Sequence, residues 1–150
     1  MSFFDQLGAL LAKYDVVGAF WVNVQLTFWA AIGSFVLGSV LALMRISPVP
    51  SLRFVGTAYV NAVRNTPLTI LMTLALLGVW TQFQLSFSTS FETNFFVYAV
   101  IVLSIYHASF VCEAIRSGVN TVPTGQAEAA RAIGLGFFPT ARHVIFPQAL

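Results

Sequence analysis

Residues that could carry out catalysis are few and dispersed in this chain of 150 residues. His107 and His143 lack companions at the spacing of metal ligands, and the carboxylates are scattered. Lys13 is the only lysine, and Ala12 rather than glycine precedes it, so the sequence has no phosphate-binding loop. The sequence therefore predicts a protein that is not an enzyme, does not itself hydrolyse ATP, and carries no cofactor or metal.

The segment that stands out is rich in small residues and follows three charge-poor stretches. It contains Glu128-Ala129-Ala130 and Gly134, and Pro147 comes after it. Alanines favour a helix, and small side chains let another surface approach its backbone closely. A helix of this kind between membrane segments is typical of a docking element for a soluble protein. A solvated connecting helix explains the composition equally well.

The composition places the chain in a lipid bilayer. Charged residues make up 8% of it, against about 25% in ordinary soluble domains, and hydrophobic residues make up 58%. The net charge of +2 is too small and too scattered to indicate a nucleic-acid partner. Cys112 is the only cysteine, which excludes an internal disulfide and a cysteine metal cage.

Three stretches are long enough to cross a bilayer as helices, which takes about 20 apolar residues. They are residues 16–44, 65–85 and 93–113. Residues 1–15 precede them and lack the basic start of a cleaved signal, so they are predicted to be a retained extracytoplasmic segment. The sequence therefore predicts an all-α membrane protein.

Arginines indicate which side of these spans faces the cytoplasm. They lie between the first two spans and after the third, whereas the connection at residues 82–94 contains Glu92 and neither lysine nor arginine. By the positive-inside rule, the N-terminus is outside and the loop at residues 114–143 is cytoplasmic. The arginines concerned are Arg45, Arg53, Arg64, Arg116, Arg131 and Arg142.

Prolines predict where the membrane helices break. Ser47-Pro48-Val49-Pro50 ends the first helix. Thr66-Pro67 either starts the second helix, with Thr66 as its cap and Pro67 at the first helical position, or kinks a longer helix that begins near Leu52. An apolar run at residues 144–146 precedes Leu150. We therefore expect a fourth span to begin there and the sequence to stop before its fold is complete.

The cytoplasmic loop is predicted to contain an amphipathic helix at residues 121–135. Pro123 suits its first turn, and Thr121 or Thr124 is expected to cap it. Glu128 lies three residues before Arg131, close enough for a weak ion pair.

The end of this helix is predicted at two glycines, Gly134 and Gly136, one of which is expected to take the left-handed conformation. Phe137 and Phe138 are expected to anchor the return to the bilayer. Pro147 would then stand near the start of the next span.

The detailed pattern of this loop resembles that of ABC importer permeases. Those proteins have Glu-Ala-Ala, a glycine four residues on, and then Ile-x-Leu-Pro, where this chain has Val144-Ile145-Phe146-Pro147. Residues 109–119 and 122–126 resemble the polar amino-acid branch of that family. Arg64-Asn65-Thr66-Pro67-Leu68 is similar to the Arg-Gly-Thr-Pro-Leu of that branch, and the asparagine in it is closest to glutamate uptake permeases.

The resemblance implies the membrane domain of a type I ABC importer with about five spans, of which this chain has three and the start of a fourth. It implies a cytoplasmic dimer of ATP-binding subunits, a second permease subunit, identical or homologous, and an extracytoplasmic substrate-binding protein as partners. It also implies that the loop lies in a cleft of the ATPase and couples it to the spans. The coupling residues would be Gly125, Gln126, Glu128, Ala129, Ala130 and Gly134.

Polar residues near the spans allow more than one interpretation. His107 is either a functional group or a neutral imidazole hydrogen-bonded to a neighbouring helix, and we expect the second. Arg64 could meet a substrate carboxylate, although its position favours a topological or lipid-facing role. Glu113 and Arg116 are expected to form an interfacial ion pair.

The sequence as a whole favours the membrane-spanning permease subunit of an ATP-driven importer for a polar amino acid, with glutamate or a near relative as the substrate. Such a subunit forms the translocation path, resides in the cell membrane and couples to a separate ATPase. A passive channel and a membrane scaffold that transports nothing are the alternatives.

Overall fold

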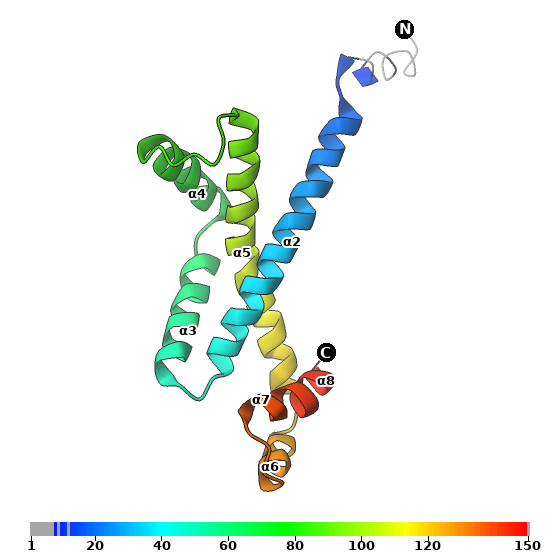
Figure 1. Cartoon of the computed structure of the whole chain (residues 1–150), viewed down its shortest axis with the longest axis vertical. Coiled ribbons are helices and arrows are strands. Elements are labelled where there is room, and N and C mark those ends of the chain that lie inside the picture. Colours follow the sequence, from blue (N-terminus) through cyan, green and yellow to red (C-terminus); the bar gives the residue numbers. More distant parts are fainter. Residues whose placement is uncertain (1–7, 9, 12, 150) are drawn as a thin grey trace.

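The computed structural model describes residues 8, 10, 11 and 13–149, and within them it contains helices and no strand. Figure 1 shows two long helices that cross, a bent arm beside them, and a group of short helices below. The elements are α2 (Val16–Ile46), α3 (Pro50–Arg64), α4 (Leu68–Thr73), the π-helix η1 (Leu74–Gln82), α5 (Phe91–Thr121), α6 (Thr124–Ala132), α7 (Phe137–Thr140), the π-helix η2 (Ala141–Ile145) and α8 (Phe146–Ala149).

Helices α2 and α5 are each 31 residues long and apolar enough to cross a membrane. They diverge at one end and pack together towards the other (Figure 1). Small residues allow this approach. A Cβ atom at Gly38 would lie 2.6 Å from the Cβ of Val111 and 2.8 Å from the carbonyl oxygen of Ala108. The α2–α5 crossing is therefore set by the absence of a side chain on α2.

The ends of α2 follow from local chemistry. The carboxylate of Asp15 accepts a hydrogen bond from the N–H of Gly18 at 2.8 Å and so caps the first turn. The helix ends at Ile46, because the proline at position 48 disfavours helix in the residue before it. Pro50 then occupies the first turn of α3, where its missing N–H costs nothing.

The segment expected as the second span, residues 65–85, contains one continuous helical arm, from Leu68 to Gln82. Helix α3 precedes it, and the pair formed by α3 and the continuous α4–η1 arm is bent by 97°. The arm from Leu68 to Gln82 is shorter than the about 20 residues that cross a bilayer, so only α3 and the arm together could form a third span. The helical arm thus begins directly after Thr66-Pro67, as in the first alternative, and a 97° bend with three non-helical residues is not the kink of one longer helix.

The capping expected at this break is wrong. The hydroxyl of Thr66 donates to the carbonyl of Ala62 at 2.8 Å, back into α3, and Pro67 stands before the first residue of α4 without a side-chain cap. The break itself has the expected cause, since proline lacks an N–H and its ring clashes with a preceding helical turn.

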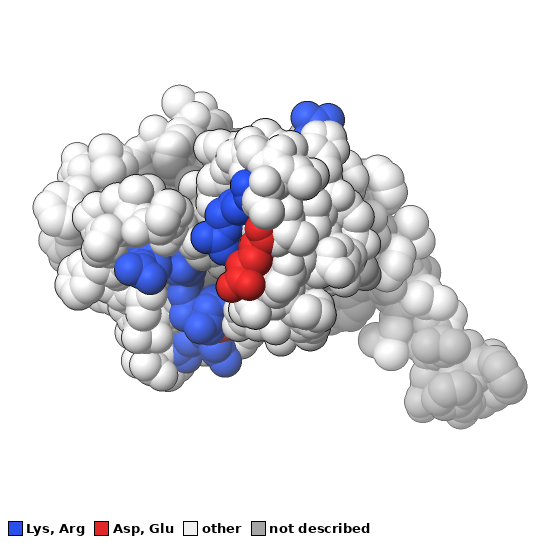
Figure 2. Space-filling view, turned by 90° about the horizontal axis from the view of Figure 1, so that it is seen from below, with Lys and Arg blue, Asp and Glu red and all other residues white. Residues whose placement is uncertain are grey.

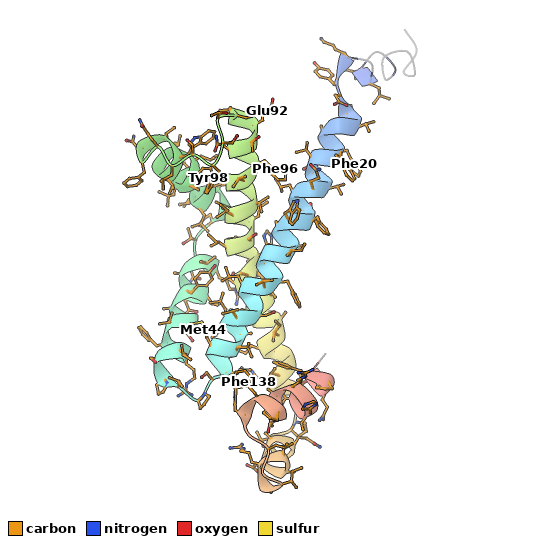
Figure 3. The ribbon with its side chains drawn as sticks, viewed as in Figure 1. Phe20, Met44, Glu92, Phe96, Tyr98 and Phe138 are labelled. Carbon is orange, nitrogen blue, oxygen red and sulfur yellow. The ribbon has the colours of Figure 1, made fainter. Side chains whose placement is uncertain are left out.

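Helix α5 extends beyond the expected 93–113 at both ends, to Phe91 and Thr121. The side chain of Asn94 is buried and binds the preceding loop, accepting from the N–H groups of Phe87 and Ser88. Tyr98, labelled in Figure 3, donates to the carbonyl of Leu85 at 2.7 Å and stacks on Trp80. These contacts fix η1 against α5.

A small core lies where α2, α3 and α5 meet. Its buried members are Leu41, Ala42, Val60, Ala108 and Cys112. Tyr59 of α3 adds a hydrogen bond to the carbonyl of Ile105 at 2.8 Å. Away from this core, apolar side chains face outward, as does Phe20 at 68% exposed (Figure 3). Helices with outward apolar surface and internally satisfied backbones suit a bilayer.

Replacing Gly38 with alanine is expected to destabilise the protein by about 1–3 kcal/mol, because the new methyl group overpacks the α2–α5 contact. Thermal unfolding of the purified protein in detergent measures the change. Gly78→Ala is the matched control, since nothing lies within 4 Å of its added methyl group. Equal melting temperatures for the two variants would contradict a tight crossing at Gly38.

Candidate functional site

Helix α6 carries the Glu-Ala-Ala segment and is shorter than the expected 121–135, running from Thr124 to Ala132. Pro123 precedes it, and no side chain caps it. The hydroxyl of Thr121 donates to the carbonyl of Gly118 in α5 at 2.7 Å instead. The expected cap by Thr121 or Thr124 is therefore wrong, because the only break between α5 and α6 is residues 122–123 and Thr121 still belongs to α5.

The end of α6 is fixed by its glycine. Gly134 has a φ of +86°, in the left-handed region, as predicted for one of the two glycines. The N–H of Gly134 donates to the carbonyl of Arg131 at 2.9 Å, and the N–H of Leu135 donates to that of Ala130 at 3.0 Å. These are the two hydrogen bonds of a Schellman motif, which stops the helix and reverses the chain.

The residues predicted to couple the loop to an ATPase fall into two groups. One residue, Ala130, is only 4% exposed and packs within the chain. The others lie on the exposed surface of the loop: Gly125, Gln126, Glu128, Ala129 and Gly134. The structure thus brings five of the six to one accessible segment.

The expected ion pair between Glu128 and Arg131 is not formed. Arg131 directs its Nε to the carbonyl of Ala127 at 3.2 Å, and the ion pairs found in the described part of the chain all involve Glu113. The carboxylate of Glu128 is exposed. Figure 2, which views this end from below, shows basic patches and a smaller acidic patch on a face that is mostly uncharged.

The chain returns towards the bundle through α7, η2 and α8. The backbone of Ala149 in α8 lies so close to Gly118 of α5 that a side chain at Gly118 would collide with its carbonyl oxygen. A cavity of about 650 Å³ lies between α6, the end of α5 and the turn after α2. Phe138, labelled in Figure 3, is 73% exposed. Both ends of the loop are thus attached to α5.

A second polar site joins the three large elements. The carboxylate of Glu113 in α5 binds Arg45 of α2 at 2.5 Å, and Arg64 of α3 lies 3.6 Å from the same oxygen. Arg116, one turn along α5, lies 3.5 Å from the other oxygen. We call Glu113, Arg45, Arg64 and Arg116 the arginine cluster.

The sequence identified only one of the partners of Glu113. The pair with Arg116 was expected from its i, i+3 spacing, whereas Arg45 and Arg64 are distant in sequence and were missed. One signal was present: Glu113 is the only acidic residue between Glu92 and Glu128, and buried arginines need a carboxylate.

Two further polar residues of the long helices, His107 and Asn23, bond within their own helices. His107 pairs its Nδ1 with the carbonyl of Leu103 at 2.9 Å and is exposed, so the expected bond to a neighbouring helix is wrong. Asn23 likewise donates to the carbonyl of Ala19. In the described residues, no group of three potential metal ligands comes together.

Comparison with known proteins identifies the family. The sequence profile of the binding-protein-dependent transport system inner membrane component matches residues 34–150. The chain belongs to this family. A solved structure, the crystal structure of an amino acid ABC transporter with histidines, superposes with a TM-score of 0.77 at 29% identity and covers 99% of this chain. These matches confirm the predicted fold class and the resemblance to ABC importer permeases.

Two relatives show where in the family the chain lies. It is 49% identical over 141 residues to the glutamate transport system permease protein GluC of Corynebacterium efficiens, covering 91% of this chain and 62% of that protein. It is 32% identical over 142 residues to the glutamate/aspartate import permease protein GltJ of Escherichia coli K12, covering 87% and 55%. The matched part of the solved structure is 65% of its chain. The chain therefore spans less than two thirds of the length of these relatives.

A double-mutant cycle tests the arginine cluster. Arg45→Gln and Glu113→Gln are expected to show a coupling energy of about 1–3 kcal/mol, because the Arg45 side chain is 8% exposed and loses its carboxylate partner in Glu113→Gln. The control cycle pairs Glu113→Gln with Arg116→Gln, whose side chain is 42% exposed, and is expected to give below about 1 kcal/mol. Denaturant unfolding measures both, and equal couplings would contradict a structural role specific to Arg45.

Proposed function

We propose that this chain is the membrane-spanning part of a permease subunit that imports a polar amino acid, glutamate or a near relative, driven by a separate ATPase. The observation that carries the proposal is the loop with α6, a short rigid helix held at both ends to a candidate span and exposed on its outer face. The relatives support the substrate class, since GluC and GltJ are named as glutamate and glutamate/aspartate permeases.

The proposed topology places the N-terminus outside and the loop in the cytoplasm, with α2, the bent pair and α5 in the bilayer. The proposed partners are a dimer of ATP-binding subunits below, a second permease subunit beside the spans, and a substrate-binding protein on the outer side. The translocation path then lies between the two permease subunits, and alternating access follows when one bundle rocks against the other.

The coupling works mechanically in this proposal. Two residues separate α5 from α6, and the Schellman turn at Gly134 passes directly into α7 and the helices that reach Gly118. A cleft that closes on Gly125, Gln126, Glu128 and Ala129 therefore moves α5 with it. Ala130 supports the helix from within.

Crosslinking tests the proposed contact. In the complete complex, cysteine at Ala129 is expected to crosslink to the ATPase, because this position is exposed on α6. Cysteine at Ala130, the adjacent but 4% exposed position, is the matched control and is expected to react far less. The native Cys112 is 0% exposed, so the background is low. Equal crosslinking of the two positions, or reaction of Ala129→Cys with an impermeant thiol reagent from the outer side, would contradict the topology.

Transport tests the rigidity of the loop. Gly134→Val is expected to lower ATP-dependent amino-acid uptake at least ~10-fold while the complex still inserts, because a β-branched residue resists the φ of +86°. Gly136→Val is the control, since Gly136 has a φ of −71° and nothing closer than 4.0 Å to an added Cβ. Uptake into proteoliposomes and the amount of inserted protein are measured together. Normal uptake by the Gly134 variant would contradict coupling through this loop, and uptake without ATP would favour a channel.

A further inference from the structure

The arginine cluster carries more positive charge than its carboxylate can balance. Three guanidinium groups surround the single carboxylate of Glu113, so the cluster has a net charge of +2, from three positive charges and one negative. In the proposed topology the cluster lies towards the cytoplasmic end of the spans, and charge that is not neutralised beside the 8% exposed Arg45 side chain is costly. The imbalance points to a second anion.

The three arginines are not equivalent. Arg45 is enclosed, with its side chain 8% exposed and its NH1 directed at Glu113 and at the sulfur of Cys112. Arg64 and Arg116 are 44% and 42% exposed and lie 3.6 and 3.5 Å from Glu113, so each keeps donors free for another ligand. Arg45 thus holds the carboxylate, and the other two present their outer faces.

The break in the second candidate span adds an independent reason. Arg64 is the last residue of α3, and the non-helical residues 65–67 follow it at the 97° bend. In the proposed topology this break lies in the bilayer, where irregular backbone is tolerated only if it is buried in protein or lines a water-filled cavity. Arg64 also lies over the ring of Phe110, 5.4 Å from its centre, which orients the guanidinium.

We propose that Arg64 and Arg116 form a binding site for the side-chain carboxylate of an acidic amino acid on its way through the permease. Guanidinium groups match carboxylates in shape and can bind them with two parallel hydrogen bonds. The site distinguishes an acidic amino acid from its amide, because an amide does not neutralise the excess charge of the cluster. This inference rests on the proposed function, and it names residues that select the substrate.

Equilibrium binding to the complete permease complex, purified in detergent without the binding protein or ATP, tests the site. Radiolabelled glutamate is expected to bind at least ~10-fold more tightly than glutamine to the unaltered complex. Arg64→Gln is expected to abolish that preference, Arg116→Gln to reduce it, and Arg64→Lys to retain part of it. Arg142→Gln, an exposed arginine of the loop, is the control and is expected to leave the preference unchanged.

The outcomes separate this inference from the proposed function. Equal binding of glutamate and glutamine to the unaltered complex, or a preference that survives in Arg64→Gln, would overturn the inference even if ATP-dependent uptake is normal. Loss of uptake by the unaltered complex, with binding still dependent on Arg64, would overturn the proposed function alone. Added phosphatidylglycerol that prevents glutamate from binding would assign the site to a lipid phosphate and also overturn the inference. Size-exclusion elution of each complex shows that the variant has assembled.

Discussion

The carboxylate of Glu113 joins the three main elements of the molecule. It binds Arg45 of α2 directly, and it lies within 3.6 Å of Arg64 from α3. Only 8% of the residues are charged, so few other electrostatic contacts are available. Separating Arg45 from Glu113 would cost free energy, because water does not readily replace either partner in a shielded pair. The relative positions of α2, α3 and α5 therefore depend on this pair together with the small apolar core beside it.

Helix α5 links the arginine cluster to the loop that contains α6. Glu113 lies eight residues before the end of α5, about 12 Å along the helix axis. Two residues then lead into α6, and the chain comes back to pack α8 against Gly118 between these two points. A short helix joined to one span by a two-residue link, and held to it again by the packing of α8 on Gly118, is suited to transmit displacement.

Several features of this arrangement were predictable because they depend on local chemistry. The apolar stretches indicated α2 and α5, the prolines indicated the breaks near residues 48 and 67, and a glycine was expected in the left-handed conformation, which Gly134 adopts. The errors concern contacts between distant residues or competing local bonds. Thr66 bonds back into α3 rather than forward, and neither the 97° bend nor the approach of Arg45 and Arg64 to Glu113 has a signature in sequence spacing. The length of α5 was also underestimated, because polar residues at its ends continue the helix beyond its apolar part.

The two proposals meet in α5. Glu113 and Arg116 move with this helix, whereas Arg64 belongs to α3. Arg64 is bound to Glu113 only loosely, at 3.6 Å, so a small displacement of α5 changes how far its charge is neutralised within the chain. At the proposed site, moving Glu113 closer would satisfy Arg64 and weaken its hold on a substrate carboxylate, and moving Glu113 away would do the opposite. A loop that shifts α5 would in this way alter the affinity for an acidic substrate through a change of distance alone. Such a difference in affinity is required, because a ligand can shift a conformational equilibrium only as far as it binds the two states differently.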